Sequence, residues 1–168
     1  MNKEIIAIEM VCLGNICRSP LAAAVLSHRS HEISQPKILV SSSGTSRYHV
    51  GESAHELSIH TWREAGYTYE HTARAFSTQS FEDQDLILTM DLTNRAMILN
   101  AAQSDEQRAK VFLLRQFDPA LSHIDPTSRE AEQLQVPDPW GEEIDSYYRV
   151  REMIERAVTG LMTQLRPA

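Results

Sequence analysis

The sequence predicts an α/β fold in which helices cover both faces of a parallel sheet. Short apolar segments alternate along the chain with longer segments of helical pattern, and this alternation is typical of parallel sheets joined by helical crossovers. The composition, with 42% hydrophobic and 23% charged residues, is ordinary for a globular protein. Because 168 residues are enough for one buried core, we expect a single domain over residues 1–168.

The first strand and the first helix are predicted near the N-terminus. Residues 5–11, IIAIEMV, are predicted as a strand because they are mostly apolar and stop short of Gly14. Residues 20–30, PLAAAVLSHRS, are rich in Ala and Leu and are predicted as a helix. We expect Ser19 to be the N-cap of this helix and Pro20 its first residue, where a missing N–H is tolerated.

A second strand and a second helix follow. Residues 37–42, KILVSS, are predicted as a strand. Residues 53–66, SAHELSIHTWREAG, are predicted as a helix, with Ser53 as the expected N-cap and Gly66 as a stop signal.

The second half of the chain continues the alternation. Residues 85–90, DLILTM, and 110–114, KVFLL, are predicted as strands, and the first of them leads into a helix that starts with DLTNRAMIL. A long loop rich in Pro and Asp covers residues 117–141, and the last helix begins near Glu142. The apolar positions of that helix recur at helical spacing and are predicted to form one buried face: Ile144, Tyr148, Met153, Ile154, Ala157, Val158, Leu161 and Leu165.

The stretch VCLGNICRSP, residues 11–20, contains the only two cysteines of the chain and lies at the junction of the first strand and the first helix. Ligands of parallel α/β sheets bind beyond the carboxyl ends of the strands. In a tight loop here, backbone N–H groups would join those of the helix N-terminus, and both favour an anion. Gly14 can adopt backbone angles that other residues avoid, and the fork of Arg18 matches two phosphate oxygens. The loop therefore predicts a site for a tetrahedral oxyanion.

Cys12 lies at the mouth of this predicted loop. A thiol beside a helix N-terminus and an arginine is stabilised as the thiolate, and a thiolate facing a phosphate ester can attack phosphorus and release an alcohol. Arg18 and the loop amides would stabilise charge on the equatorial oxygens. Ser19 could hydrogen-bond the Cys12 sulfur and make it a better leaving group. An inert buried thiol, the usual state of a free cysteine, is the alternative.

The leaving oxygen needs a proton, so a general acid is expected elsewhere in the chain. Asp138 is the candidate, because it lies between two prolines in VPDPWG, residues 136–141, where the backbone is stiff. The same carboxylate could then activate the water that cleaves the cysteinyl phosphate. The alternative is that Asp138 only forms a turn, since Asp beside Pro is common in loops.

These motifs resemble those of the low-molecular-weight protein tyrosine phosphatases. Cys12, Arg18 and Ser19 within VCLGNICRSP match the family's N-terminal loop, and DPW, residues 138–140, matches its late Asp-Pro-aromatic motif. SSSGTSRYHVG, HTAR and DLILTMDLTN are similar to further segments of the family, so the resemblance extends over nearly the whole chain. It implies a four-stranded parallel sheet with flanking helices, no metal or cofactor, and hydrolysis of phosphotyrosine or other aryl phosphates.

The resemblance also implies roles for particular residues. Cys12 would be the nucleophile, Arg18 the phosphate clamp and Asp138 the general acid and base. Tyr48 and Trp140 would form a wall for the substrate ring, with ordinary half-exposed aromatics as the alternative. The residues expected to bind phosphate are Leu13, Gly14, Asn15, Ile16, Cys17 and Arg18. The residues expected to hold the loop in shape are Asn15 and its partners Ser19, Ser42 and His71.

Three features depart from the family pattern. Gly141 follows Trp140 where many members carry a second aromatic residue, which leaves the depth and selectivity of the aryl slot open. Tyr147 and Tyr148 form a pair inside the predicted last helix, and no regulatory role is transferred to them. Glu9 interrupts the first strand, where a buried carboxylate without a partner would be costly.

Cys17 has two interpretations. It is either a small residue that packs behind the loop, or a redox partner that forms a reversible disulfide with Cys12 after oxidation. The disulfide requires suitable Cα spacing. A zinc site is not favoured, because no second cysteine pair follows in the chain.

Two other functions are compatible with such a loop. Arsenate reduction of the thioredoxin-coupled kind needs further cysteines near the third strand, and residues 76–90 contain none. A catalytically silent phosphate- or phosphotyrosine-binding module would lack Cys12, Arg18 or Asp138, and all three are present. The sequence therefore predicts a protein tyrosine phosphatase.

The net charge and the distribution of apolar residues limit the classes of partner that this protein can have. The net charge of −7 argues against nucleic-acid binding, no apolar run approaches the ~20 residues of a membrane span, and the N-terminus does not resemble a secretory signal. We expect a cytoplasmic enzyme that acts on a phosphotyrosine protein or a small aryl phosphate. The oligomeric state stays open, with a monomer favoured.

Overall fold

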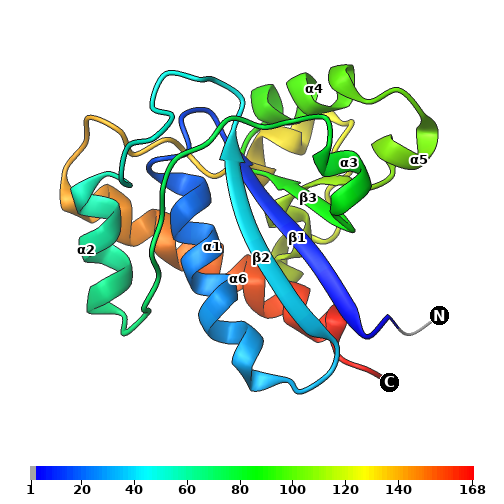
Figure 1. Ribbon diagram of the computed structural model, residues 1–168, viewed down its shortest axis with the longest axis horizontal. Coiled ribbons are helices and arrows are strands. Elements are labelled where there is room, and N and C mark those ends of the chain that lie inside the picture. Colours follow the sequence, from blue (N-terminus) through cyan, green and yellow to red (C-terminus); the bar gives the residue numbers. More distant parts are fainter. Residues whose placement is uncertain (1–2) are drawn as a thin grey trace.

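The structure is a computed structural model that describes residues 3–168. Within these residues a four-stranded parallel sheet forms the centre, with the strand order β2-β1-β3-β4 (Figure 1). The predicted α/β fold is confirmed. The strands lie close to the predicted ranges and are β1 (Ile5–Cys12), β2 (Lys37–Gly44), β3 (Leu86–Thr89) and β4 (Val111–Leu113).

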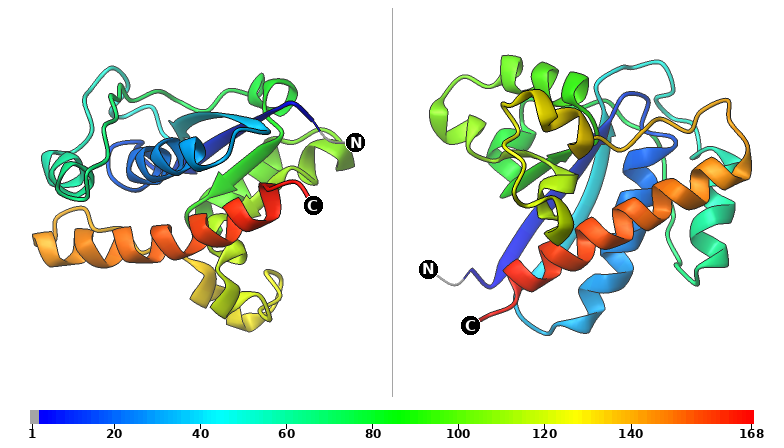
Figure 2. Two further views of the ribbon diagram at one scale, coloured as in Figure 1. Left: turned by 90° about the horizontal axis from the view of Figure 1, so that it is seen from below. Right: turned by 180° about the vertical axis from the view of Figure 1, so that it is seen from behind.

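Each face of the sheet carries its own core, because successive side chains of a strand point to opposite faces. Ile8 and Met10 of β1 belong to a core shared with α1 (Arg18–Arg29) and α6 (Ile144–Leu165), two helices that lie side by side (Figure 2). Val11 of β1 belongs to the core on the other face, with residues of α3 (Ser80–Asp83) and α4 (Leu92–Ala101). The remaining helices are α2 (Glu56–Glu64) and α5 (Asp105–Arg108).

Two of the predicted helix starts, those of α1 and α2, are wrong. In both cases contacts with the loop after β1 determine where the helix begins. α1 begins at Arg18 with Cys17 as its N-cap residue, because the Ser19 hydroxyl points back to the Cys12 sulfur and the Asn15 side chain. The expected N-cap Ser53 of the second helix lies outside α2.

The true N-cap of α2 is His55, whose ring accepts a hydrogen bond from the Leu57 N–H. The His55 N–H in turn donates to the Ile16 carbonyl and so sets where the helix can start. The predicted stop at Gly66 is confirmed, since Gly66 has a φ of 87°. Hydrogen bonds from Gly66 and Tyr67 close the last turn on Arg63 and Trp62.

The buried face of α6 differs from the predicted one at its start. Tyr148 was expected inside, but Tyr147 is the buried residue, and the Tyr148 hydroxyl donates to Glu64 near the surface. Ile144, Met153 and Leu165 are only partly buried. Tyr147 is buried because it packs on residues of the loop after β1, a contact that helical periodicity alone does not reveal. Ile154, Ala157, Val158 and Leu161 are buried as predicted.

Several short elements were not predicted. The long segment of residues 117–141 holds the 3-10 turns η3 (Pro119–Leu121) and η4 (Arg129–Leu134), and two more, η1 (Ser30–Glu32) and η2 (Leu114–Phe117), follow α1 and β4. Elements this short contain too few residues for a hydrophobic period to appear. Across residues 3–168, no helix is both long and apolar enough to cross a membrane.

Candidate active site

The loop of residues 13–17 joins β1 to α1 at the carboxyl end of the sheet. Its left-handed residue is Asn15, with a φ of 58°, and not Gly14 as the sequence suggested. Gly14 instead leaves room for His49, whose ring would come within 3.1 Å of a Cβ added at that position. Gly44 at the end of β2 allows an even closer approach, because a Cβ there would lie 2.7 Å from the Leu13 carbonyl oxygen.

The Asn15 side chain holds this loop through hydrogen bonds in several directions. Its Nδ2 donates to the hydroxyls of Ser19 (2.8 Å) and Ser42 (3.0 Å), and its Oδ1 accepts from the Arg74 backbone N–H (2.9 Å). The His71 Nε2 lies 2.6 Å from the Asn15 carbonyl oxygen and donates to it. Burial lowers the pKa of His71, which favours the neutral ring. The three expected partners therefore contact Asn15, and Arg74 is a fourth.

Cys12 ends β1 with its side chain buried beneath the loop. The Asn15 backbone N–H points at the sulfur at 3.3 Å, and the Ser19 hydroxyl lies 3.0 Å from it. With the N-terminus of α1 just beyond, these donors surround the sulfur with positive electrostatic potential. The sulfur thus lies among hydrogen-bond partners from the loop and from the first turn of α1.

Arg18 is buried, and its guanidinium is held by two oxygens from different segments. Nη1 donates to Asp91 Oδ2 at 2.7 Å and to the Val136 carbonyl oxygen at 3.0 Å, while Nη2 lies 3.6 Å from Asp138 Oδ2. Burial by itself would lower the pKa of Arg18, but the negative charges at Cys12, Asp91 and Asp138 outweigh it and raise that pKa. Arg18 therefore keeps its positive charge inside the site.

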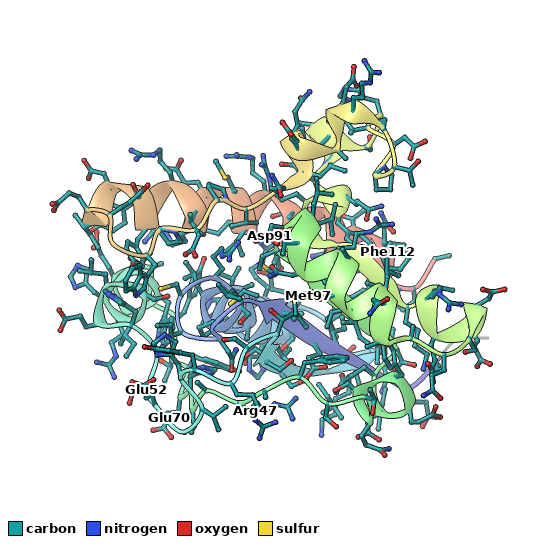
Figure 3. All side chains as sticks on the ribbon, turned by 90° about the horizontal axis from the view of Figure 1, so that it is seen from above. Arg47, Glu52, Glu70, Asp91, Met97 and Phe112 are labelled. Carbon is teal, nitrogen blue, oxygen red and sulfur yellow. The ribbon has the colours of Figure 1, made fainter. Side chains whose placement is uncertain are left out.

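Asp91 is a site residue that the sequence analysis missed. Asp91 follows β3 after one intervening residue and lies at the start of α4 (Figure 3). It is the N-cap of that helix, and its Oδ1 accepts a hydrogen bond from the Asn94 N–H at 2.7 Å. The sequence does carry one signal, since an acidic residue just beyond a parallel strand lies at the ligand-binding edge of the sheet.

Asp138 lies on the segment opposite the loop, with its side chain half-exposed. Its Oδ1 accepts a hydrogen bond from the Trp140 N–H at 3.1 Å. Gly141 follows with a φ of 82°, and the Glu142 N–H closes a turn on Pro139. A second aromatic residue at position 141 would be strained in this left-handed turn, which explains the glycine.

One cavity of about 450 Å³ is lined by most of the residues predicted to act on the substrate or to bind phosphate, but not by Asn15. Its rim carries two strongly exposed aromatics, Tyr48 and Trp140, which are 88% and 63% exposed. Ser46 and His49 also line it and were not predicted, and the His49 Nδ1 lies 2.5 Å from Glu52. The other residues of the lining are Cys12, Leu13, Gly14, Ile16, Cys17, Arg18 and Asp138.

Cys17 is buried and packs against Ile16, Ala73 and Tyr147. Its sulfur lies 3.6 Å from the Tyr147 hydroxyl. Burial raises the pKa of Cys17 to about 12, so this sulfur is a thiol at neutral pH. Both cysteines are free in this structure, and the proposed disulfide stays a prediction.

Comparisons with known proteins relate the chain to one family of phosphatases. Residues 7–168 match a family model described as low molecular weight phosphotyrosine protein phosphatase. A low molecular weight protein-tyrosine-phosphatase of Streptomyces coelicolor is 35% identical over 157 residues, which cover 93% of this chain and 91% of that protein.

Solved structures show the same likeness. A protein tyrosine phosphatase from Entamoeba histolytica superimposes with a TM-score of 0.81 at 29% identity, over 95% of this chain and 96% of the other. An arginine phosphatase from Geobacillus stearothermophilus has a TM-score of 0.78 at 26% identity, over 95% and 92% of the two chains. Proteins named for two different phosphate-bearing residues thus share this fold.

Proposed function

The chain belongs to the low molecular weight phosphotyrosine protein phosphatase family, and we propose that it hydrolyses phosphotyrosine and other aryl phosphate monoesters through a cysteinyl-phosphate intermediate. One observation carries the proposal: Cys12, Arg18 and Asp138 line a single cavity, in which the Arg18 guanidinium lies 3.6 Å from the Asp138 carboxyl. A nucleophile, a fixed positive charge and a proton donor are the groups that transfer of a phosphoryl group to sulfur requires.

Binding comes first. The phosphate dianion enters the loop of residues 13–17, where backbone N–H groups and the start of α1 favour negative charge. Arg18 offers a guanidinium already oriented by Asp91, so little side-chain entropy is lost when it meets the oxygens. The substrate ring lies between the aromatic side chains of Tyr48 and Trp140 at the rim.

Two chemical steps follow. The Cys12 thiolate attacks phosphorus, the P–O bond to the aryl group breaks, and Asp138 gives its proton to the leaving oxygen. Asp138 then takes a proton from water, the water oxygen attacks phosphorus, and the S–P bond breaks to release inorganic phosphate and the thiolate. Ser19, 3.0 Å from the sulfur, stabilises the departing thiolate by a hydrogen bond. Arg18 and the loop amides balance the charge of the equatorial oxygens in both steps.

The lining of the cavity favours an aryl ester over a phosphorylated guanidinium. Leu13, Ile16, Tyr48 and Trp140 present apolar surface, and Asp138 is the one carboxylate among the described residues of the lining. A guanidinium leaving group would call for further negative charge beside it. The proposed substrates are therefore a phosphotyrosine protein or a small aryl phosphate, and the proposed setting is a reducing one such as the cytoplasm, because Cys12 must stay a thiol.

The test is turnover by the purified protein in a reductant. We expect hydrolysis of p-nitrophenyl phosphate and of a phosphotyrosine peptide, inhibited by vanadate, with free phosphoarginine cleaved more slowly. Cys12→Ser should abolish turnover and still bind inorganic phosphate in calorimetry. Reduced wild-type protein that hydrolyses none of these substrates would refute the proposal, and preference for phosphoarginine would refute the substrate class.

A further inference from the structure

Glu9 is completely buried in the central strand, and the reaction described above does not use it. In the sheet it lies between Ser41 of β2 and Ile87 of β3. Alternation along β1 places its side chain on the same face as Val11 and on the face opposite to Cys12. The carboxyl therefore cannot reach the cavity itself, and any effect on the site must pass through another residue.

That other residue is Arg74, which comes from the segment between α2 and α3 that crosses over β2 and β1 (Figure 1). Its Nη2 lies 2.5 Å from Glu9 Oε1, and its Nε donates to the Ser42 carbonyl oxygen at 2.9 Å. Its backbone N–H donates to Asn15 Oδ1 at 2.9 Å. Arg74 thus connects β1, β2 and the anion-binding loop.

The Asn15 amide carries this connection to the nucleophile. With its Oδ1 engaged by the Arg74 N–H, its Nδ2 must face the hydroxyls of Ser19 and Ser42. The Ser19 hydroxyl in turn lies 3.0 Å from the Cys12 sulfur. A continuous series of polar contacts therefore runs from the carboxylate on one face of the sheet to the sulfur on the other.

We propose that Glu9 is a positioning residue for the phosphatase reaction, whose ionised carboxylate keeps Arg74 where it orients Asn15 and the loop around Cys12. This inference rests on the proposed function.

An ionised carboxylate at position 9 does not make the fold more stable, so stability is not the reason for its presence. Burial raises the pKa of its carboxyl, an effect that Asp83 adds to and that Ser80, Arg74 and Ser43 only partly oppose. Its second oxygen, Oε2, completes no hydrogen bond of good geometry within the described residues, and neither does the Ser43 hydroxyl. The ionised form therefore weakens the fold, because a raised carboxyl pKa lowers the free energy of unfolding as pH rises through that pKa.

Arg74 does not need Glu9 for its own solvation. Its side chain is 51% exposed, whereas that of Glu9 is fully buried. Breaking a buried ion pair is costly when it leaves an unpaired charge buried. Removing Glu9 would leave no such charge, because the Arg74 side chain would stay in contact with water. Loss of the carboxylate should therefore leave the fold as stable as before, or more stable, and harm only the site.

The experiment compares Glu9→Leu and Glu9→Gln with the wild type, and Asp85→Asn is the matched control. Asp85 is another carboxylate that contacts β1, since it accepts from the Ala7 N–H at 2.9 Å, but it lies far from the loop along the strand. We expect Glu9→Leu to lower kcat about tenfold, the scale of one lost hydrogen bond to a charged group. Glu9→Gln, which can still accept a neutral hydrogen bond, should lower it less, and Asp85→Asn should not change it.

Thermal unfolding and a pH profile separate positioning from a merely structural role. At neutral pH we expect both Glu9 variants to keep or raise the Tm of the wild type while kcat falls. As pH falls, the wild-type carboxyl becomes protonated, so the ratio of wild-type kcat to that of Glu9→Gln should shrink toward one. A Tm and a kcat that fall together, or a ratio that stays constant with pH, would overturn the inference.

A second readout separates failure of this inference from failure of the proposed function. Affinity for inorganic phosphate, measured by calorimetry, reports the loop without any turnover and should weaken in both Glu9 variants. If the wild type binds phosphate but hydrolyses nothing, the proposed function fails and phosphate affinity still tests Glu9. If the Glu9 variants do not fold, Arg74→Gln, changed at a half-exposed side chain, should show the same loss of kcat, and unaltered kcat there would refute the role.

Discussion

Arg18 and Asp91 form an ion pair of 2.7 Å that ties the first turn of α1, which follows the loop after β1, to the start of α4. The guanidinium belongs to the first turn of α1 and the carboxylate to the N-cap of α4. The pair therefore joins the helix starts that follow the carboxyl ends of two neighbouring strands, β1 and β3. Because the Arg18 side chain is only 4% exposed, this pair limits the positions that its guanidinium can take. The orientation of the Arg18 side chain, the proposed phosphate clamp, is thus decided outside the loop.

Asp91→Asn should weaken the clamp without removing the helix cap, because Asn caps helices as well as Asp does. We expect kcat/KM for p-nitrophenyl phosphate to fall roughly tenfold, the scale of one hydrogen bond between charged groups, and Tm to change little. Steady-state kinetics and thermal unfolding measure the two effects. Unchanged kinetics would show that Val136 alone orients Arg18.

Asp138→Asn should slow the reaction more for an ester whose leaving oxygen is more basic, because that oxygen depends more on protonation. We expect a fall of roughly a hundredfold or more for phenyl phosphate and a smaller one for p-nitrophenyl phosphate, whose leaving oxygen is less basic. Comparing kcat for the two esters provides the measurement. An equal loss for both esters would mean that Asp138 acts on Arg18 through their 3.6 Å contact instead of as an acid.

Alkylation near neutral pH should distinguish the two cysteines. The pKa of Cys17 is raised by burial to about 12, so Cys17 is protonated far below that pH and is a poor nucleophile. We expect iodoacetate to modify Cys12 first and inorganic phosphate to protect it, as peptide mass spectrometry can show. Modification of Cys17 at an equal rate would contradict the buried, protonated state of its thiol.

Gly160→Ala should destabilise the fold strongly. A Cβ at this position of α6 would overlap the Phe117 carbonyl oxygen and press on Pro119, and the helix cannot move away without opening the core. We expect a loss of about 3 kcal/mol in the free energy of unfolding, the upper part of the range for overpacked sites. Urea denaturation gives the value, with Thr159→Ala, at the exposed neighbouring position, as the control. A change in the free energy of unfolding no larger than that of the control would show that the segment with Phe117 and Pro119 can move to make room for the added methyl group.

The candidate site divides into a part that is local in sequence and a part that is not. Cys12, Asn15, Arg18 and Ser19 lie within residues 12–19, so their meeting follows from one strand-to-helix junction. The left-handed angle was expected at Gly14 and occurs at Asn15, a residue type that tolerates this region and is held there by the hydrogen bonds of its side chain. Local preference is a weak guide where side-chain contacts choose the conformation.

The amino-acid pattern by itself was sufficient for the parallel α/β fold, the order of its main elements and the position of the loop between β1 and α1. These features follow from hydrophobic periodicity and from a contiguous motif, both of which are local properties of a chain. Pairing of Arg18 with Asp91, the link from Glu9 through Arg74 to Asn15, and the burial of Tyr147 instead of Tyr148 were decided only by the tertiary structure. Each joins segments far apart in the chain, and only packing of the helices and strands decides which side chains meet.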